Sequence, residues 1–111
     1  MVWYSRTVVY RIYTLYDTCV IKSFKHAGLQ AYFEKDSKAG IRPEHAKRLT
    51  PILTALSAAA KPSDMNVPGW RLHELKPNQP RVWSVTVSGN WRVTFKFEGG
   101  DVVVVDYLDY H

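Results

Sequence analysis

The sequence has little cysteine and no long apolar run, and each absence excludes a class of protein. Cys19 is the only cysteine among 111 residues, which rules out an internal disulfide and a zinc site built from several cysteines. No apolar run reaches the roughly 18 residues that a membrane-spanning helix needs. Residues 1–19 contain Arg6 and Arg11, and they lack the uninterrupted apolar core of a secretory signal peptide. We therefore expect a cytoplasmic protein with no membrane partner.

The short motifs of several enzyme classes are missing too. The chain has no Gly-rich phosphate loop, no G-x-S-x-G nucleophile elbow and no RNA-stacking motif of the RRM type. His26 and His45 are too far in sequence from the other two histidines to form a local metal motif. The sequence thus predicts neither a metal nor a cofactor.

The composition is that of one small basic domain. The chain is 46% hydrophobic and 14% aromatic, which suits a globular protein with a single core. Its formal net charge is +5, which favours a polyanionic partner such as nucleic acid or an acidic protein. Many small basic proteins bind no such partner, so charge alone leaves this open.

The first half of the main body predicts a short strand and two helices. Residues 20–24 read as the strand, and Ser23 is a candidate cap for a helix through Lys38 that stops at Gly40. Pro43 suits the first position of the second helix. The apolar residues of these helices recur at helical spacing: Leu29, Tyr32 and Phe33 in the first, and Ala46, Leu49, Leu53, Leu56 and Ala60 in the second.

A proline interrupts the pattern of the second helix. An interior proline costs about 3 kcal/mol in a helix. We therefore expect Pro51 to kink the helix, or the helix to restart with Thr50 as its cap.

The second half predicts an antiparallel meander. Strands are expected at 70–76, 82–87, 91–97 and 102–107, and the last lacks alternation, as a strand buried on both faces would. The turns "SGN" and "GG" would join the last three strands. The fold class is therefore α+β, with two helices packed on one face of a mainly antiparallel sheet.

Several polar residues could carry chemistry, although each could equally be a solvated surface residue. His73 shares a strand face with Arg71, and Arg92 alternates with core residues and so faces away from the core. Asp109 beside His111 could orient or charge an imidazole. Pattern alone supports only a basic α+β domain that could bind nucleic acid.

Four stretches together resemble the HigB toxins of the RelE/ParE superfamily of bacterial toxin–antitoxin systems. They are "IKSFKHAGLQAYFEKDSKAGI", "WRLHELK", "VWSVTVSGNWRVTFKFEGGDV" and the closing "VDYLDYH". The resemblance runs from residue 20 to residue 111 and implies a RelE-like fold. It also implies a ribosome-dependent endoribonuclease that cuts messenger RNA in the A site, neutralised by a HigA antitoxin with a helix-turn-helix.

The resemblance also assigns site residues. The catalytic candidates are His73, Lys76, Arg92, Asp109 and His111, and the substrate-binding candidates are Arg71, Asn90 and Tyr110. Cutting RNA without a metal needs a base for the ribose 2′-hydroxyl, an acid for the departing 5′-oxygen and cations for the phosphate charge. The two histidines would serve as base and acid in either order, and the end of the chain would dock beside the sheet face that the helices leave open.

Two other functions remain open at this point. ParE-type relatives share the fold but inhibit DNA gyrase without cleavage, and their sites generally lack this set of residues. A basic domain that only binds RNA is the third reading. Cleaved messenger RNA would distinguish the first reading from both others.

Residues 1–19 stand apart from the rest. The resemblance begins abruptly at Val20, and a GUG valine codon can initiate translation in bacteria. We expect a toxin domain at 20–111 and an N-terminal extension at 1–19 that comes from a start set too far upstream. The alternative is a genuine N-terminal strand, because the extension is rich in strand-forming residues.

Overall fold

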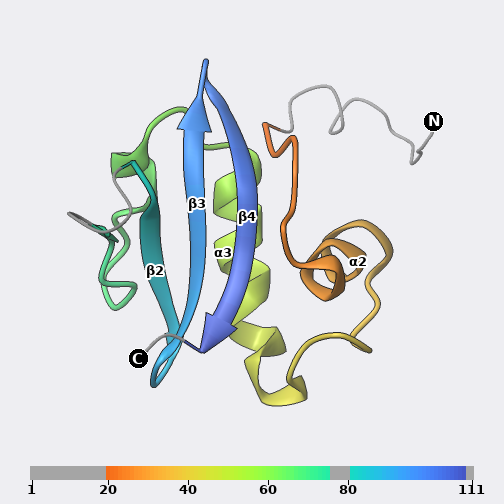
Figure 1. Ribbon diagram of the computed structural model, residues 1–111. Helices are drawn as coiled ribbons and strands as arrows, with labels where there is room; N and C mark the ends of the chain where they lie inside the picture. Colours follow the sequence, from red (N-terminus) through yellow and green to blue (C-terminus); the bar gives the residue numbers. More distant parts are fainter. Residues whose placement is uncertain (1–19, 76–80, 110–111) are drawn as a thin grey trace.

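The computed structural model describes residues 20–75 and 81–109, which form helices packed on a four-stranded antiparallel sheet (Figure 1). Helix α3 runs behind β3 and β4, and α2 lies beyond the β4 edge. The elements, with η for a 3₁₀ helix, are α2 (Ala27–Lys35), η1 (Pro43–His45), α3 (Ala46–Ser57), η2 (Pro62–Met65), β1 (His73–Glu74), β2 (Trp83–Ser88), β3 (Trp91–Glu98) and β4 (Asp101–Asp109). The predicted α+β class is confirmed, and the extension at 1–19 lies outside the described residues.

The sheet is the predicted meander, with strand order β1-β2-β3-β4. Gly89 has φ +55 in the β2–β3 turn, and Gly99 and Gly100 have φ +60 and +87 in the β3–β4 turn. Such left-handed conformations suit the twist of two-residue hairpin turns and favour glycine. These turns bring the end of β4 beside the β2–β3 turn at one end of the sheet (Figure 1).

The core lies between α3 and the sheet. Leu49, Ile52 and Leu56 are almost fully buried, as are Val93 and Phe95 on the central strand. Burying a side chain of this size contributes about 1.5–3 kcal/mol. The core therefore fixes α3 to one face of the sheet, which leaves the chemistry of the other face and of the sheet ends to polar residues.

The N-terminal strand is present only as two isolated parallel bridges to β4, from Ile21 and Phe24. The predicted cap is wrong: His26 caps α2, because its Nδ1 accepts a hydrogen bond from the Leu29 backbone at 2.9 Å. The Ser23 hydroxyl instead accepts from the Val104 backbone at 2.8 Å. Ser23 thus holds the N-terminal segment to β4 and is not available to the helix.

Helix α2 is shorter than predicted. It ends at Lys35, and Asp36 takes the left-handed C-cap conformation with φ 57. An aspartate tolerates this conformation better than most residues. The helix therefore stops well before Gly40, the predicted stop.

Helix α3 is continuous from Ala46 to Ser57 with Pro51 inside it, so the predicted restart at Thr50 is wrong. Pro51 is exposed, and its ring meets solvent where it would otherwise have met the core. The helix loses one backbone hydrogen bond there, while buried leucines on its other side hold it to the sheet. Ala60 lies beyond the helix and is exposed, whereas Ala59 is buried.

Two predicted strands differ from the structure. Of the predicted strand at 70–76, the described residues 70–75 form a strand only at His73–Glu74, because Arg71 has φ 54 and breaks the extended backbone. In β4 the prediction of burial on both faces is wrong for Val104, which is 42% exposed. Val104 has φ 47 where the β3–β4 register shifts, as the extra residue of a β-bulge does.

Gly28 and Gly40 meet at a close backbone contact between α2 and the loop after it. A Cβ on Gly28 would lie 2.5 Å from the carbonyl oxygen of Gly40 and 2.7 Å from its Cα. Gly40 is therefore required for packing and not, as predicted, for ending the helix.

Gly28→Ala should destabilise the protein by about 1–3 kcal/mol, because the added methyl overpacks this contact. In an unconstrained helix the same change would stabilise by about 0.5–1 kcal/mol, so the sign of the effect decides. Urea unfolding measures it, and a rise in the free energy of unfolding would show that the two backbones do not meet.

Candidate active site

Strand pairing brings two of the predicted catalytic residues to one face of the sheet. His73 pairs with Ser84, Ser84 with Thr94, and Arg92 with Thr86. Directly paired residues share a face and alternate residues return to it, so His73 and Arg92 both lie on the face opposite α3. Strand spacing and rise place their Cα atoms about 12 Å apart, which two long side chains can span from either side of a phosphate.

His73 is exposed, and one of its ring nitrogens is fixed by the backbone. Its Nδ1 lies 3.1 Å from the carbonyl oxygen of Arg71. A carbonyl only accepts, so Nδ1 carries the proton and the neutral ring keeps its lone pair on Nε2. The left-handed backbone of Arg71 turns this carbonyl toward the ring. In an extended strand the carbonyl would point toward the neighbouring strand instead. Arg71 itself is exposed.

Arg92 is half-buried and folds back on the β2–β3 turn. Its Nη1 donates to the carbonyl of Gly89 at 2.7 Å and to that of Trp91 at 3.3 Å. A guanidinium has five N–H donors, so Nε and Nη2 retain donors that could meet a phosphate. Asn90 is exposed in the same turn.

The end of β4 lies at this same turn. Asp109 pairs with Trp91 and is exposed. Alternation places Asp109 on the face of Trp91, opposite to that of Arg92. Lys76, Tyr110 and His111 lie outside the described residues, so the predicted approach of the chain end to His73 stays a prediction.

The face opposite α3 is less open than the sequence suggests. Ser84, beside His73, is fully buried, and Thr94 is 7% exposed. The hydroxyls of Ser84 and Thr86 are buried without a hydrogen-bond partner in the described part of the chain. Substrate contacts on this face therefore fall to the longer side chains, His73 and Arg92.

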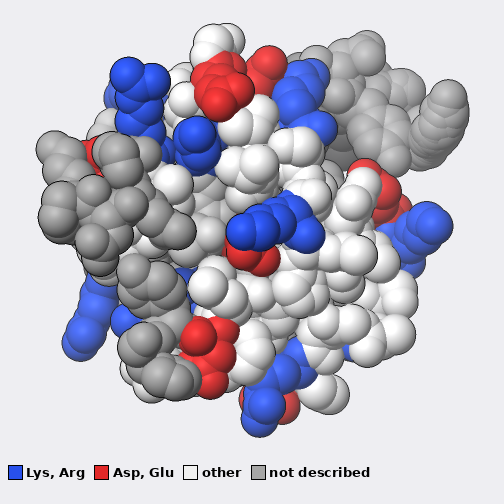
Figure 2. Space-filling view, in the orientation of Figure 1, with Lys and Arg blue, Asp and Glu red and all other residues white. Residues whose placement is uncertain are grey.

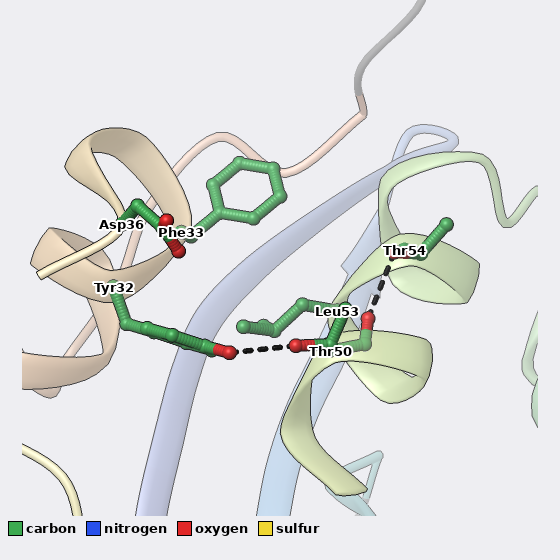
Figure 3. A pocket seen from close by; sticks show the side chains of 6 residues that line it. All are labelled: Tyr32, Phe33, Asp36, Thr50, Leu53 and Thr54. Carbon is green, nitrogen blue, oxygen red and sulfur yellow. Dashed lines mark hydrogen bonds between the residues drawn. The ribbon is translucent and has the colours of Figure 1, made fainter. Parts of the chain in front are cut away.

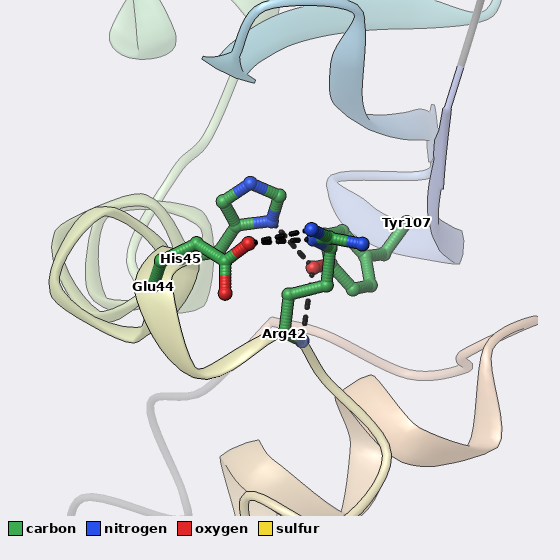
Figure 4. A network of polar contacts seen from close by, with 4 residues as sticks. All are labelled: Arg42, Glu44, His45 and Tyr107. Atoms are coloured by element: carbon green, nitrogen blue, oxygen red, sulfur yellow. Dashed lines mark hydrogen bonds and ion pairs between the residues drawn. The ribbon is translucent and has the colours of Figure 1, made fainter.

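A polar network that the sequence did not reveal lies behind this end of the sheet, with His45 and Tyr107 buried at its centre and Arg42 and Glu44 at the surface. Nδ1 of His45 lies 2.6 Å from the hydroxyl of Tyr107, and the backbone N–H of Arg42 donates to the same hydroxyl at 3.3 Å (Figure 4). Nη2 of Arg42 forms an ion pair with Glu44 at 2.7 Å. Because the amide can only donate, the phenolic proton is not used by Arg42, and Nδ1 accepts it in the tautomer of His45 that carries its proton on Nε2.

Burial sets the charge state of the two buried groups. Desolvation lowers the pKa of His45 from 6.5, with Arg42 and Arg48 adding to the effect and Glu44 opposing it. Desolvation also raises the pKa of Tyr107 above 10. Both groups are therefore neutral at pH 7, which fits a phenol that donates to an imidazole.

Aromatic rings complete this network around Trp91. The Trp91 ring lies 4.8 Å from that of Tyr107 and 5.3 Å from that of His45, between centroids. The guanidinium carbon of Arg42 lies 5.6 Å from the Trp91 ring centroid. Helical spacing could have revealed His45, which stands four residues before Leu49 on the apolar stripe of α3.

A separate hollow of about 220 Å³ opens between α2 and α3 (Figure 3). Its lining includes Tyr32, whose hydroxyl lies 2.6 Å from that of Thr50. The hollow is lined by helix and cap residues and by none of the catalytic candidates.

Residues 20–75 and 81–109 contain neither a metal-binding cluster nor a membrane-spanning helix. No group of three or more His, Cys, Asp or Glu side chains is placed to hold a metal ion. Among these same residues, no helix combines the length and apolarity needed to cross a membrane.

The chain matches a protein-family model and a characterised relative. A family model described as the RelE-like toxin of the type II toxin-antitoxin system HigB matches residues 22–111. The endoribonuclease HigB of Proteus vulgaris is 40% identical over 92 residues, which make up 83% of this chain and 100% of that protein.

The depressed pKa of His45 predicts a pH-dependent stability. Between the lowered folded-state pKa and the unfolded value of 6.5, the unfolded chain binds more protons than the folded one. The free energy of unfolding should therefore fall as the pH drops below 6.5, by at most about 1.4 kcal/mol per pH unit. Urea unfolding between pH 7 and pH 5 measures the slope, and His45→Gln should flatten it. An unchanged slope in that variant would show that His45 titrates freely.

Proposed function

The chain belongs to the HigB-like family of RelE-like toxins from type II toxin–antitoxin systems, and we propose that it is an endoribonuclease that cleaves messenger RNA on the ribosome. The observation that carries this proposal is the placement of His73 and Arg92 on one sheet face. A histidine base and a phosphate-binding cation are two of the parts that RNA cleavage requires. The name of the Proteus vulgaris relative, an endoribonuclease, supports the same reaction class.

His73 removes the proton from the ribose 2′-hydroxyl, and the oxygen then attacks the adjacent phosphate. The bond from Nδ1 to the Arg71 carbonyl leaves Nε2 as the basic nitrogen. The positive charge that develops on the ring is stabilised by the same carbonyl. His111 protonates the departing 5′-oxygen, or the two histidines exchange these roles.

Arg92 neutralises the charge that builds on the phosphate in the transition state. Its anchorage on the Gly89 carbonyl fixes the guanidinium before substrate arrives, so little reorganisation is needed during reaction. Lys76 adds a second cation, and Asp109 orients a histidine or the attacking hydroxyl. Arg71, Asn90 and Tyr110 contact the bound RNA, the tyrosine by stacking on a base.

A toxin of a type II system has an antitoxin as its partner. The finer identity proposed here is a HigA-like antitoxin with a helix-turn-helix, and the substrate is messenger RNA in the ribosomal A site, in the cytoplasm. The net charge of +5 favours association with the polyanionic ribosome. Figure 2 shows Lys and Arg side chains scattered among acidic ones over this view, so the attraction is spread over the surface.

Arg92→Ala should lower the single-turnover cleavage rate on programmed ribosomes by about 10²–10³-fold, the range for loss of one transition-state donor. Lys96→Ala is the matched control, because Lys96 alternates with Arg92 on β3 and lies at the far end of the strand, 3.8 Å from Glu98. Binding to ribosomes, measured by co-sedimentation, should change little in either variant.

Two results would contradict this assignment. Equal loss of binding and cleavage in Arg92→Ala would make Arg92 a docking residue. Equal cleavage by Arg92→Ala and Lys96→Ala would remove Arg92 from the site altogether.

A further inference from the structure

The buried pair His45 and Tyr107 joins three segments that meet at one end of the sheet. His45 ends η1, Tyr107 lies in β4, and both rings contact Trp91, the first residue of β3. Their exposed fractions are 4% and 3%. The hydrogen bond between them is short, at 2.6 Å, and it lies where water cannot replace it.

These contacts lie directly behind the candidate site. Tyr107 pairs with Val93 and Asp109 pairs with Trp91, so the pair between them is Arg92 with Leu108. Alternation puts the rings on the α3 side while Arg92 faces the other side. The rings of His45 and Tyr107 therefore support the same stretch of β3 backbone that carries Arg92.

We propose that His45 and Tyr107 are positioning residues, which fix the end of β4 against the start of β3 and so hold the backbone of Arg92 where its guanidinium meets the phosphate. This inference rests on the proposed endoribonuclease function. Neither ring touches the RNA, because both are buried on the opposite side of the sheet from Arg92.

The geometry explains why this end of the sheet needs such a tie. Among residues 20–75 and 81–109, the last pair of the β3–β4 ladder at this end of the sheet is Trp91 with Asp109. The catalytic candidates Asp109 and His111 follow Tyr107 by two and four residues. A small displacement of reacting groups, of about 1 Å, can reduce a rate by about 100-fold. A hydrogen bond to η1 just before the strand ends limits such displacement.

Arg42, which directly precedes η1, adds to the contacts that hold Tyr107 and Trp91. Its backbone N–H donates to the Tyr107 hydroxyl, and its guanidinium lies over the Trp91 ring. Glu44 holds that guanidinium in place through the ion pair at 2.7 Å. The tyrosine hydroxyl thus has two partners from the segment before α3, and phenylalanine would lose both.

The test compares Tyr107→Phe with Tyr32→Phe. Tyr32 is a matched control, because it is also buried and its hydroxyl also makes a 2.6 Å hydrogen bond, to Thr50 in the hollow between α2 and α3 (Figure 3). Tyr107→Phe should lower the single-turnover cleavage rate by about 10- to 100-fold. The ribosome concentration at half-maximal rate should stay within about twofold, and Tyr32→Phe should leave both values within about twofold of the wild type.

A second set of variants covers the case in which Tyr107→Phe does not fold. His45→Leu removes the acceptor and should lower the rate as Tyr107→Phe does. His45→Asn places its Oδ1 at the position of Nδ1, retains an acceptor and should recover most of the rate. The double variant His45→Leu/Tyr107→Phe should be no slower than either single variant, because residues that act as one unit are not additive.

Three outcomes would overturn the proposal. They are equal cleavage rates for the two Tyr→Phe variants, a loss confined to ribosome affinity, and additive losses in the double variant. Failure of the wild-type protein to cleave messenger RNA is a distinct result, which overturns the proposed function itself and this inference with it.

Discussion

The pairing of β3 with β4 is the constraint on which the site depends. It runs from Glu98 with Asp101 at the turn to Trp91 with Asp109 at the far end. The tight glycine turn starts the register, and the bulge at Val104 shifts it by one residue in β4. A slip of one residue would move every side chain to the other face, so this register decides that Arg92 faces away from α3 while Tyr107 and Trp91 face toward it.

Each face of that strand pair has a separate task. The α3 side is apolar until the sheet end, where His45 and Tyr107 satisfy each other in a buried position. Such a bond contributes about 0.5–1.5 kcal/mol net to the free energy of unfolding. Removing one partner costs more, about 1–3 kcal/mol, because the other is left buried without a hydrogen bond. The other side carries His73 and Arg92, each anchored through a backbone carbonyl. Rigid support on one face and reactive groups on the other is the arrangement that preorganised catalysis requires.

The sequence predicted the elements better than it predicted their ends and polar contacts. Helical spacing predicted both helices, and glycine pairs predicted the turns of the meander. Both signals come from residues that are near each other in the sequence. The cap at His26 was missed because the Ser23 hydroxyl bonds to β4 and not to the helix. The short β1 was missed because the left-handed backbone of Arg71 interrupts the strand. His45 and Tyr107 are 62 residues apart, and no local pattern relates them. His73 and Arg92 were assigned by resemblance, and strand register then placed them on one face.

The central claim is that RNA is cleaved at this end of the sheet by attack of the ribose 2′-hydroxyl on the adjacent phosphate. Histidine transfers the protons, and arginine stabilises the charge on the phosphate. The most direct measurement is the structure of the new ends when purified toxin acts on messenger RNA in programmed ribosomes. Attack by the 2′-hydroxyl predicts a 2′,3′-cyclic phosphate, or the 3′-phosphate formed from it, on the upstream fragment and a 5′-hydroxyl on the downstream one. A 3′-hydroxyl with a 5′-phosphate would mean that water attacked the phosphate, and it would contradict this account.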